Sequence, residues 1–284
     1  MSICYLNGQF VPREEARISP LDRGFLFGDG VYEVIPVYAG QPFRLGAHLE
    51  RLGRSLEGIR LANPHTVAEW TSLIQRLIDA HPQWPEQALY LQITRGADVA
   101  RTHAFPDVPP TVFMMTNALA VPSDEDFERG AAVISAADNR WLRCDLKTTA
   151  LLANCLLRQL AVDEHCDETV LFRDDLLTEG AASNIFVVRD GVLHAPPKST
   201  LILPGITYDV VFELARANSL PVEVGEITKD EVRSADELWM SSSTKEVMPI
   251  TTFDGKTVGN GRAGPVARCM REWFIRARTE GAVS

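Results

Sequence analysis

The stretch RCDLKTTALLANCLLRQLA, residues 143–161, contains Lys147, the first lysine in a chain of 284 residues. Of the 28 lysines and arginines, only five are lysines, so arginine is the usual cation of this sequence. Arginine keeps its proton, whereas a partly desolvated lysine can lose it and act as an amine nucleophile. The apolar residues on both sides of Lys147 predict partial burial. Lys147 is therefore either a surface cation at the start of a helix or a lysine that forms a Schiff base.

The composition is that of a globular protein, with 45% hydrophobic and 23% charged residues. A chain of this length predicts about two domains. The net charge of −10 argues against nucleic acid or an anionic membrane as a partner, because both select a basic surface. An anionic substrate must therefore be held by local cations.

Several features of the sequence predict a cytoplasmic protein without a metal site. The start, MSICYLNGQF, lacks the basic segment and apolar run of a signal peptide, and no stretch approaches the ~18 apolar residues of a membrane span. An odd number of widely spaced cysteines without a CxxC motif predicts reduced thiols rather than disulfides or a zinc site. These cysteines are Cys4, Cys144, Cys155, Cys166 and Cys269.

The first half of the chain reads as a hairpin, two helices and further strands. Asn7-Gly8 between two β-prone runs predicts the hairpin, and apolar residues spaced three and four apart predict helices over 45–61 and 66–81. Strands are predicted over 25–38, 88–96 and 110–118, with a long loop between the last two. The polar stretch 118–130 predicts a linker, so we expect an N-terminal α/β domain over 1–119 and a C-terminal cofactor-binding domain over 120–284.

The second half mixes strands and helices without regular βαβ alternation. Thr148 or Thr149 is expected to cap a helix that runs to about His165. Turn residues predict hairpins around Asp174 and at Asp190-Gly191. Further strands are expected over 131–137, 221–227 and 237–243, and helices over 205–218 and from Pro265. Runs of strands mixed with helices favour an α+β fold.

Glu179 ends a predicted strand and is followed by Gly180 and two alanines. Small neighbours allow a flat ligand to approach the carboxylate closely. A glutamate in a turn is common in any protein. As a site residue, Glu179 is suited to hold a protonated pyridine nitrogen, which makes the ring a better electron sink.

Two stretches of the second half could bind an anion. Gly205-Ile206-Thr207 begins a predicted helix, whose free N–H groups and dipole attract phosphate, although an ordinary helix cap reads the same way. Ser241, Ser242, Ser243 and Thr244 follow a predicted strand and offer several hydroxyl donors, although a polar turn would also contain them.

In the first half, the candidates are Arg51, Tyr32 and the pair Arg101 and His103. Arg51 lies in a predicted helix, where a solvated position is the simpler reading. Arg101 and His103 lie two residues apart in the long loop, so both could face one carboxylate, or they could be plain surface residues. Tyr32 follows Gly28-Asp29-Gly30, which lacks the spacing of a dinucleotide fingerprint. Hydrolase, zinc-peptidase and NTPase motifs do not occur in the sequence.

The order of these features resembles that of the class IV, or fold-type IV, aminotransferases, which use pyridoxal 5'-phosphate. The resemblance covers essentially the whole chain. It rests on six stretches: FGDGVYEV (27–34), HLERL (48–52), RCDLKTTALLAN (143–154), LTEGAASNIF (177–186), ILPGITYDVV (202–211) and MSSSTKEVMPI (240–250). It implies a two-domain α+β enzyme, with a smaller N-terminal α/β domain and a larger, barrel-like C-terminal domain.

The resemblance also implies a role for each candidate residue. Lys147 matches the lysine that holds the cofactor as a Schiff base and then moves the substrate's α-proton, and Glu179 matches the partner of the pyridine nitrogen. The cofactor is converted to pyridoxamine phosphate during turnover. The positions that match phosphate and cofactor binding are Arg51, Ile206, Thr207, Ser242 and Ser243, with Thr244 beside the substrate.

Within this family, Tyr32 and the Arg101-x-His103 loop resemble the carboxylate trap of D-amino acid aminotransferases. In that branch the loop comes from the neighbouring subunit, which implies a homodimer with the active site at the interface. The implied reaction moves an amino group from a D-amino acid such as D-alanine to a 2-oxo acid such as 2-oxoglutarate. Ala181-Ala182, where some D-enzymes have serines, and Lys245 depart from the pattern.

The alternatives within the family are a branched-chain L-amino acid aminotransferase, an aminodeoxychorismate lyase and an R-selective amine transaminase. The branched-chain enzymes lack the Arg-x-His pair, and an amine transaminase has no need of two cations for an α-carboxylate. A protein that binds the cofactor without catalysis is the alternative from another class.

Overall fold

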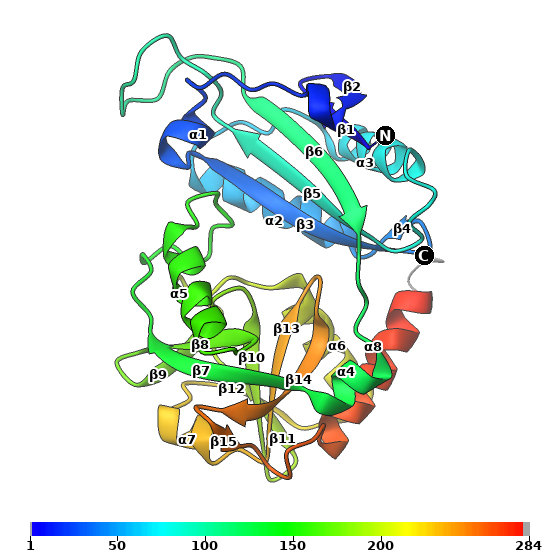
Figure 1. Cartoon of the computed structure of the whole chain (residues 1–284), viewed down its shortest axis with the longest axis vertical. Helices are drawn as coiled ribbons and strands as arrows, with labels where there is room; N and C mark the ends of the chain where they lie inside the picture. Colours follow the sequence, from blue (N-terminus) through cyan, green and yellow to red (C-terminus); the bar gives the residue numbers. More distant parts are fainter. Residues whose placement is uncertain (1, 281–284) are drawn as a thin grey trace. The chain divides into compact units, whose positions relative to one another are not determined.

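The computed structural model describes residues 2–280, which form two compact units (Figure 1). Of these residues, the first unit comprises 2–120 and Leu146–Leu151, and the second comprises Val121–Asp145 and Leu152–Glu280. The short segment with Lys147 thus belongs to the first unit, although the residues on both sides of it belong to the second. The division of the chain near residue 120 into two functional domains stays a prediction.

Within residues 2–120, the first unit is built on an antiparallel six-stranded sheet of order β2-β1-β6-β5-β3-β4. The predicted hairpin forms at Asn7-Gly8, where both residues have positive φ. The strands are β1 (Ile3–Leu6), β2 (Gln9–Pro12), β3 (Gly30–Tyr38), β4 (Gln41–Pro42), β5 (Gln87–Thr94) and β6 (Thr111–Ala118). The helices are η1 (Arg13–Glu15), α1 (Arg23–Phe27), α2 (Leu45–Gly58) and α3 (Val67–Asp79).

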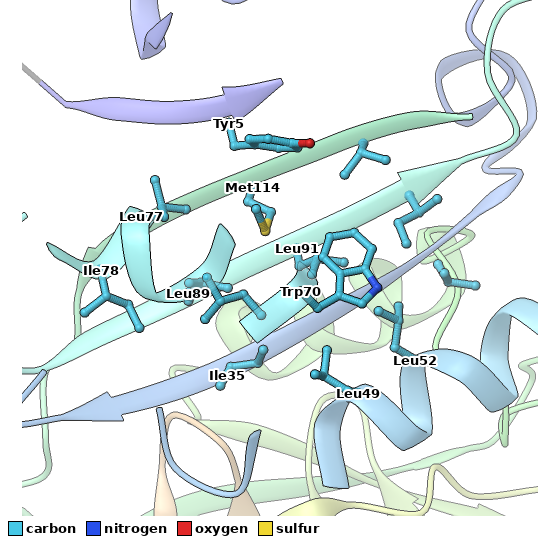
Figure 2. Close-up of a cluster of buried hydrophobic side chains, with 14 of the residues drawn as sticks. Tyr5, Ile35, Leu49, Leu52, Trp70, Leu77, Ile78, Leu89, Leu91 and Met114 are labelled. Carbon is cyan, nitrogen blue, oxygen red and sulfur yellow. The ribbon is translucent and has the colours of Figure 1, made fainter. Parts of the chain in front are cut away.

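Helices α2 and α3 cover one face of this sheet, as their apolar spacing predicts. Their buried side chains, such as Leu52 and Trp70, meet those of β3 and β5, such as Ile35 and Leu89 (Figure 2). Because side chains alternate along β3, Glu33 points to the same covered face, whereas Tyr32 points to the other. Burial of this apolar surface is the main stabilising contribution to the unit.

The segment that contains Lys147 extends this unit along the edge of β3. The Tyr32 N–H donates to the Lys147 carbonyl at 3.0 Å, and the Thr149 N–H donates to the Gly30 carbonyl at 2.9 Å. Gly30 is required here, because a Cβ at this position would lie 2.7 Å from the Ile93 carbonyl oxygen and 3.2 Å from the Thr149 hydroxyl. The FGDGVYEV stretch therefore allows the lysine segment to pack closely.

Within the described part of the second unit, one nine-stranded mixed sheet has the order β12-β11-β10-β13-β14-β7-β8-β9, with β15 paired to β14. Neighbours are antiparallel except for β7 with β8, β7 with β14 and β11 with β12. The strands are β7 (Ala131–Ala137), β8 (Glu168–Arg173), β9 (Leu176–Gly180), β10 (Asn184–Arg189), β11 (Val192–Ala195), β12 (Val222–Val224), β13 (Glu237–Ser242), β14 (Glu246–Phe253) and β15 (Lys256–Thr257).

The helices of the second unit are α4 (Asp124–Arg129), α5 (Leu152–Asp163), α6 (Ile206–Ala217), α7 (Lys229–Arg233) and α8 (Pro265–Glu280). Helix α6 packs on β10 and β13 through aromatic contacts of Phe186 with Tyr208 and Phe212. These contacts fix the start of α6 beside the ends of the same strands. None of the helices in residues 2–280 is both long and apolar enough to cross a membrane.

Three predictions about local structure were wrong. Helix α5 begins at Leu152, because Thr148 and Thr149 are engaged along β3 and do not cap it. The expected linker contains helix α4, which Ser123 and Asp126 cap reciprocally. The residues before β3, expected to be strand, form the short helix α1 with Asp22 as its cap.

Candidate active site

Lys147 is half-buried in the first unit, and its surroundings come from β3 and α2. Its backbone N–H donates to the Ser55 hydroxyl at 3.2 Å, and its Nζ lies 4.2 Å from the centre of the Tyr32 ring. The ammonium thus lies over the face of a phenol on the sheet face that α2 and α3 leave uncovered. The Tyr32 ring is 5.7 Å from that of Tyr90, whose hydroxyl donates to Gln92.

Arg51 lies on the covered face of the same sheet, where it forms a buried ion pair. Its Nε and Nη2 donate to the two carboxylate oxygens of Glu33 at 2.8 and 2.7 Å, and His48 Nδ1 bonds the same carboxylate at 2.8 Å. Burial opposes ionisation of Glu33, but Arg51 and His48 outweigh it and lower the pKa of Glu33 to about 2. Arg51 is therefore held rigidly by Glu33 at two of its nitrogens.

Glu179 lies at the end of β9, in a buried network of charges in the second unit. Arg140 Nη1 donates to Glu179 Oε1 at 2.5 Å, while Arg140 Nε and Nη2 donate to Asp138 at 3.0 and 2.9 Å. The other oxygen of Glu179 accepts from Asn184 and from the Leu203 N–H, both at 3.1 Å. Arg140 therefore divides its donors between two carboxylates.

Burial is the largest influence on Glu179 and raises its pKa to about 7, although Arg140 and the Leu203 N–H act in the opposite direction. Asp138 is also desolvated, but its hydrogen bonds with Arg140 keep its pKa below the ordinary value. A buried carboxylate whose negative charge is incompletely compensated favours a cationic partner.

The start of α6 lies beside this network. Gly205 is the N-cap residue, and no side chain of the described residues caps the N–H groups that follow it. Asn184, which bonds Glu179, also donates to the Leu203 carbonyl at 3.0 Å, and a Cβ at Gly205 would lie 2.1 Å from Asn184 Oδ1. Glu179 and the helix start with Ile206 and Thr207 thus belong to one local site.

The predicted hydroxyl-rich turn joins β13 to β14. Ser241 pairs with Asn184 across the sheet, and its buried hydroxyl has no hydrogen-bond partner within residues 2–280. Ser242 and Ser243 are half-buried and Thr244 is exposed. The Ser242 hydroxyl accepts from the N–H of Lys245 at 3.1 Å.

Lys245 and the two alanines have structural partners in the second unit. Lys245 Nζ lies 3.7 Å from the buried carboxylate of Glu168 and 3.3 Å from the Asp167 carbonyl oxygen. Glu168 also accepts from the Ser183 hydroxyl at 3.0 Å. Ala181 is buried, whereas Ala182 is exposed.

Arg101 and His103 lie in the exposed loop between β5 and β6, and both contact the ring of Phe27. The Arg101 guanidinium carbon is 4.8 Å from the ring centre, and the His103 ring centre is 5.4 Å from it. The structure therefore brings these two side chains together on one aromatic ring of α1.

The sequence interpretation missed Arg140, Asp138 and Asn184. Arg140 and Asp138 precede the lysine segment in DNRWLRCD, where two opposite charges two residues apart were the available signal. Asn184 follows LTEGAAS directly, and an amide at the start of a strand gave no local indication of its contacts.

The donors of the second unit fit pyridoxal phosphate. A flat pyridine ring needs an acceptor for its nitrogen and donors for its phosphate. Glu179 supplies a buried carboxylate and the start of α6 supplies backbone N–H groups. Ser241 supplies a buried hydroxyl that makes no hydrogen bond with the part of the chain that the structure describes.

Comparison with known proteins gives the same class. Residues 30–253 match the amino-transferase class IV family. D-alanine aminotransferases of Staphylococcus epidermidis and Bacillus licheniformis are 39% and 40% identical to this chain. They cover 96% and 92% of it, and the matches include 97% and 92% of their own lengths. The crystal structure of a branched-chain amino acid aminotransferase from Escherichia coli has a TM-score of 0.89 and 26% identity, and that match covers 97% of this chain and 94% of the other.

A second structure of a branched-chain amino acid aminotransferase, from T.th., was determined with pyridoxamine 5'-phosphate. It has a TM-score of 0.91 and 29% identity, and the match covers 98% of this chain and 94% of the other. These matches, together with the site, define a pyridoxal phosphate-dependent transaminase, and they confirm the predicted fold-type IV architecture. The chain belongs to the amino-transferase class IV family.

Proposed function

We propose that this chain is a D-amino acid aminotransferase, which moves an amino group from a D-amino acid such as D-alanine to a 2-oxo acid such as 2-oxoglutarate. The observation that carries the proposal is the 39–40% identity to D-alanine aminotransferases over nearly the whole chain. Identity to the branched-chain aminotransferase structures of similar coverage is 25–30%. The paired Arg101 and His103 agree with a substrate that carries an α-carboxylate.

When bound, pyridoxal phosphate supplies the electron sink for the carbanion at the substrate's α-carbon. Lys147 would hold the cofactor covalently, and its amine would serve as the base that moves the substrate's α-proton. Glu179 would accept a hydrogen bond from the ring nitrogen of the bound cofactor and would favour its protonated form. Ile206, Thr207, Ser242, Ser243 and Arg51 bind or orient the phosphate.

Tyr32, Arg101 and His103 receive the substrate carboxylate, with Thr244 at the edge of the substrate site. A guanidinium, an imidazole and a phenol can all donate to one carboxylate, which holds the α-carbon in a fixed orientation. Holding the carboxylate on one side decides which α-hydrogen faces Lys147, and this is the physical origin of D-selectivity.

We propose further that the enzyme is a homodimer with active sites at the subunit interface. Helix α5 exposes Leu152, Leu156 and Leu160, which are 74%, 60% and 44% accessible. Their spacing of four residues places them on one face of the helix, and such an apolar stripe marks an interaction surface. A second copy of the chain is the partner we propose for it.

We place the enzyme in the cytoplasm. All five cysteines are free, and Cys155 and Cys269 are exposed thiols. Unpaired exposed thiols are typical of a reducing compartment.

Visible absorption of the purified protein with pyridoxal phosphate tests the function. We expect D-alanine to bleach the band of the lysine-bound cofactor and 2-oxoglutarate to restore it, with L-alanine and L-leucine inactive. Bleaching by L-leucine alone would favour the branched-chain alternative. Lys147→Ala should lose both the band and turnover, by at least about 10³-fold. Retention of both would exclude the role of Lys147.

A further inference from the structure

The loop between β5 and β6, residues 97–110, is fixed at both of its ends by Asp22. This buried carboxylate accepts hydrogen bonds from the hydroxyls of Thr94 and Thr111 at 3.0 and 2.6 Å, and these residues end β5 and begin β6. Gly96 has a φ of +88°, and a Cβ there would lie 2.0 Å from the Pro109 carbonyl oxygen. The two ends of the loop are therefore packed against each other.

Arg23 of α1 holds the middle of the same loop. Its Nη1 donates to the carbonyls of Thr102 at 2.5 Å and Ala104 at 3.3 Å, and its Nη2 donates to the carbonyl of His103 at 3.3 Å. Its Nε donates to Asp29 at 2.8 Å. Arg23 is only 4% exposed, so these bonds form away from water and contribute more than surface contacts.

A second buried arginine holds the far side of the loop. The Arg95 guanidinium lies 3.6 Å from the centre of the Phe105 ring, and its Nε donates to Asp29 at 2.9 Å. Its other nitrogens donate to the carbonyls of Ile59 and Arg60 at 2.6 and 3.2 Å. One carboxylate, Asp29, thus orients both Arg23 and Arg95 toward consecutive residues of the loop.

The three carbonyls that accept from Arg23 belong to Thr102, His103 and Ala104, which directly follow Arg101 in the chain. Because their peptide groups turn toward Arg23, the side chains of Arg101 and His103 lie outside the bonded core of the loop and meet on Phe27. Arg23 also lies over this ring, at 4.7 Å from its centre. The relative placement of Arg101 and His103 therefore depends on Arg23.

We propose that Arg23 is a positioning residue for the substrate carboxylate: its bonds to three consecutive carbonyls preset the geometry of Arg101 and His103. The inference rests on the proposed function, in which those two side chains receive the carboxylate. Arg23 itself contacts no substrate in this account. It lowers the cost of ordering the loop when substrate binds.

The test compares Arg23→Gln, Arg23→Lys and the exposed control Arg17→Gln in the holoenzyme. We expect Arg23→Gln to raise the KM for D-alanine about tenfold with kcat changed less than about twofold, because hydrogen bonds of a charged donor are lost away from the chemistry. Arg23→Lys should recover part of the loss, and Arg17→Gln should match the wild type. An unchanged KM in Arg23→Gln overturns the proposal.

A double-variant cycle separates positioning from general destabilisation. In an Arg101→Ala, His103→Ala background, Arg23→Gln should have little further effect on KM, because no side chains remain to be positioned. A full tenfold effect in that background would overturn the proposal. If Arg101→Ala and His103→Ala themselves leave the KM for D-alanine unchanged, the carboxylate role fails, and with it that part of the proposed function.

Hydrogen–deuterium exchange of the peptide spanning 97–110 measures the loop independently of substrate. We expect faster exchange in Arg23→Gln and not in Arg17→Gln. If Arg23→Gln does not fold, Arg23→Lys replaces it, because lysine keeps the positive charge beside Asp29 but has a single nitrogen for three carbonyls. That variant should raise both KM and loop exchange by about threefold. Unchanged values for both would overturn the proposal.

Discussion

Two buried pairs of glutamate and arginine, Glu33 with Arg51 in the first unit and Glu179 with Arg140 in the second, differ in how the glutamate titrates. Glu33 has a pKa of about 2, whereas Glu179 has a pKa of about 7. Both carboxylates are desolvated. The difference lies in how many hydrogen bonds each receives from its arginine and in the like charge of Asp138 near Glu179.

Glu33 accepts two bonds from Arg51 and one from His48. Glu179 accepts a single bond from Arg140, because the other nitrogens of that arginine serve Asp138. A carboxylate that receives two bonds from one arginine has its negative charge compensated within the fold. A carboxylate that shares its arginine with another carboxylate keeps part of its negative charge uncompensated. A protonated pyridine nitrogen can compensate that charge.

The largest expected effect is on stability. Glu33→Gln removes the charge that faces Arg51, and breaking a buried ion pair should lower the free energy of unfolding by about 3–5 kcal/mol. Urea denaturation measures it. The exposed Glu57→Gln, on the helix that also contains Arg51, is a control expected to change stability by less than ~0.5 kcal/mol. A similar small change for Glu33→Gln would remove the distinction between the two pairs.

The second effect concerns pH, where the two glutamates act with opposite sign. The folded pKa of Glu33 is depressed, so its contribution is present above its unfolded pKa and is lost as pH falls toward 2. The folded pKa of Glu179 is raised, so its contribution is present at low pH and is lost as pH rises toward 7. In the cofactor-free protein, the stability difference between wild type and Glu179→Gln should change by on the order of 3 kcal/mol from pH 4.5 to 7. If the free energies of unfolding of wild type and Glu179→Gln changed with pH in the same way, this expectation would be contradicted.

The third effect is on turnover. Glu179→Gln keeps the shape of the side chain but cannot offset a charge on the ring nitrogen, so kcat with D-alanine should fall about 10²-fold, comparable to the loss of one electrostatic contact in an active site. The Glu57→Gln variant serves again as the control. Full activity in Glu179→Gln would mean that Glu179 is as structural as Glu33.

The smallest effect comes from removing one neutral donor. Asn184→Ala deletes a hydrogen bond to Glu179 and should raise its pKa by less than about one unit, which NMR titration of the labelled carboxyl group can follow. The matched change, His48→Ala, should raise the pKa of Glu33 and yet leave that group ionised at pH 7. A fall in the pKa of Glu179 would show that Asn184 does not stabilise the carboxylate.

Local signals in the sequence predicted the elements well. Asn7-Gly8 predicted the first hairpin, and Gly205 predicted the start of α6 because both signals act within a few residues. The caps of α1 and α4 are local signals that the sequence interpretation overlooked, whereas the failure at α5 involved tertiary competition. Thr148 and Thr149 have the chemistry of helix caps, but bonds to β3 retain them, and the helix begins only at Leu152.

The same distinction applies to the site. Lys147 and Glu179 lie in sequence motifs that could be recognised along the chain. Their roles stay predictions. Arg140 contacts Glu179 across 39 residues, and Arg23 contacts the loop carbonyls across about 80. No local pattern encodes such pairings, because they arise only when distant elements pack.

The assignment of the lysine segment to the first unit has a consequence for synthesis. About 25 residues of the other unit, Val121–Asp145, separate it from the rest of its own unit. At 5–20 residues per second, the ribosome adds this segment roughly 1–5 s after the sheet it joins has been made. The edge of β3 that receives Lys147 therefore remains open during that interval, and Lys147 reaches its place only when translation has passed the middle of the chain.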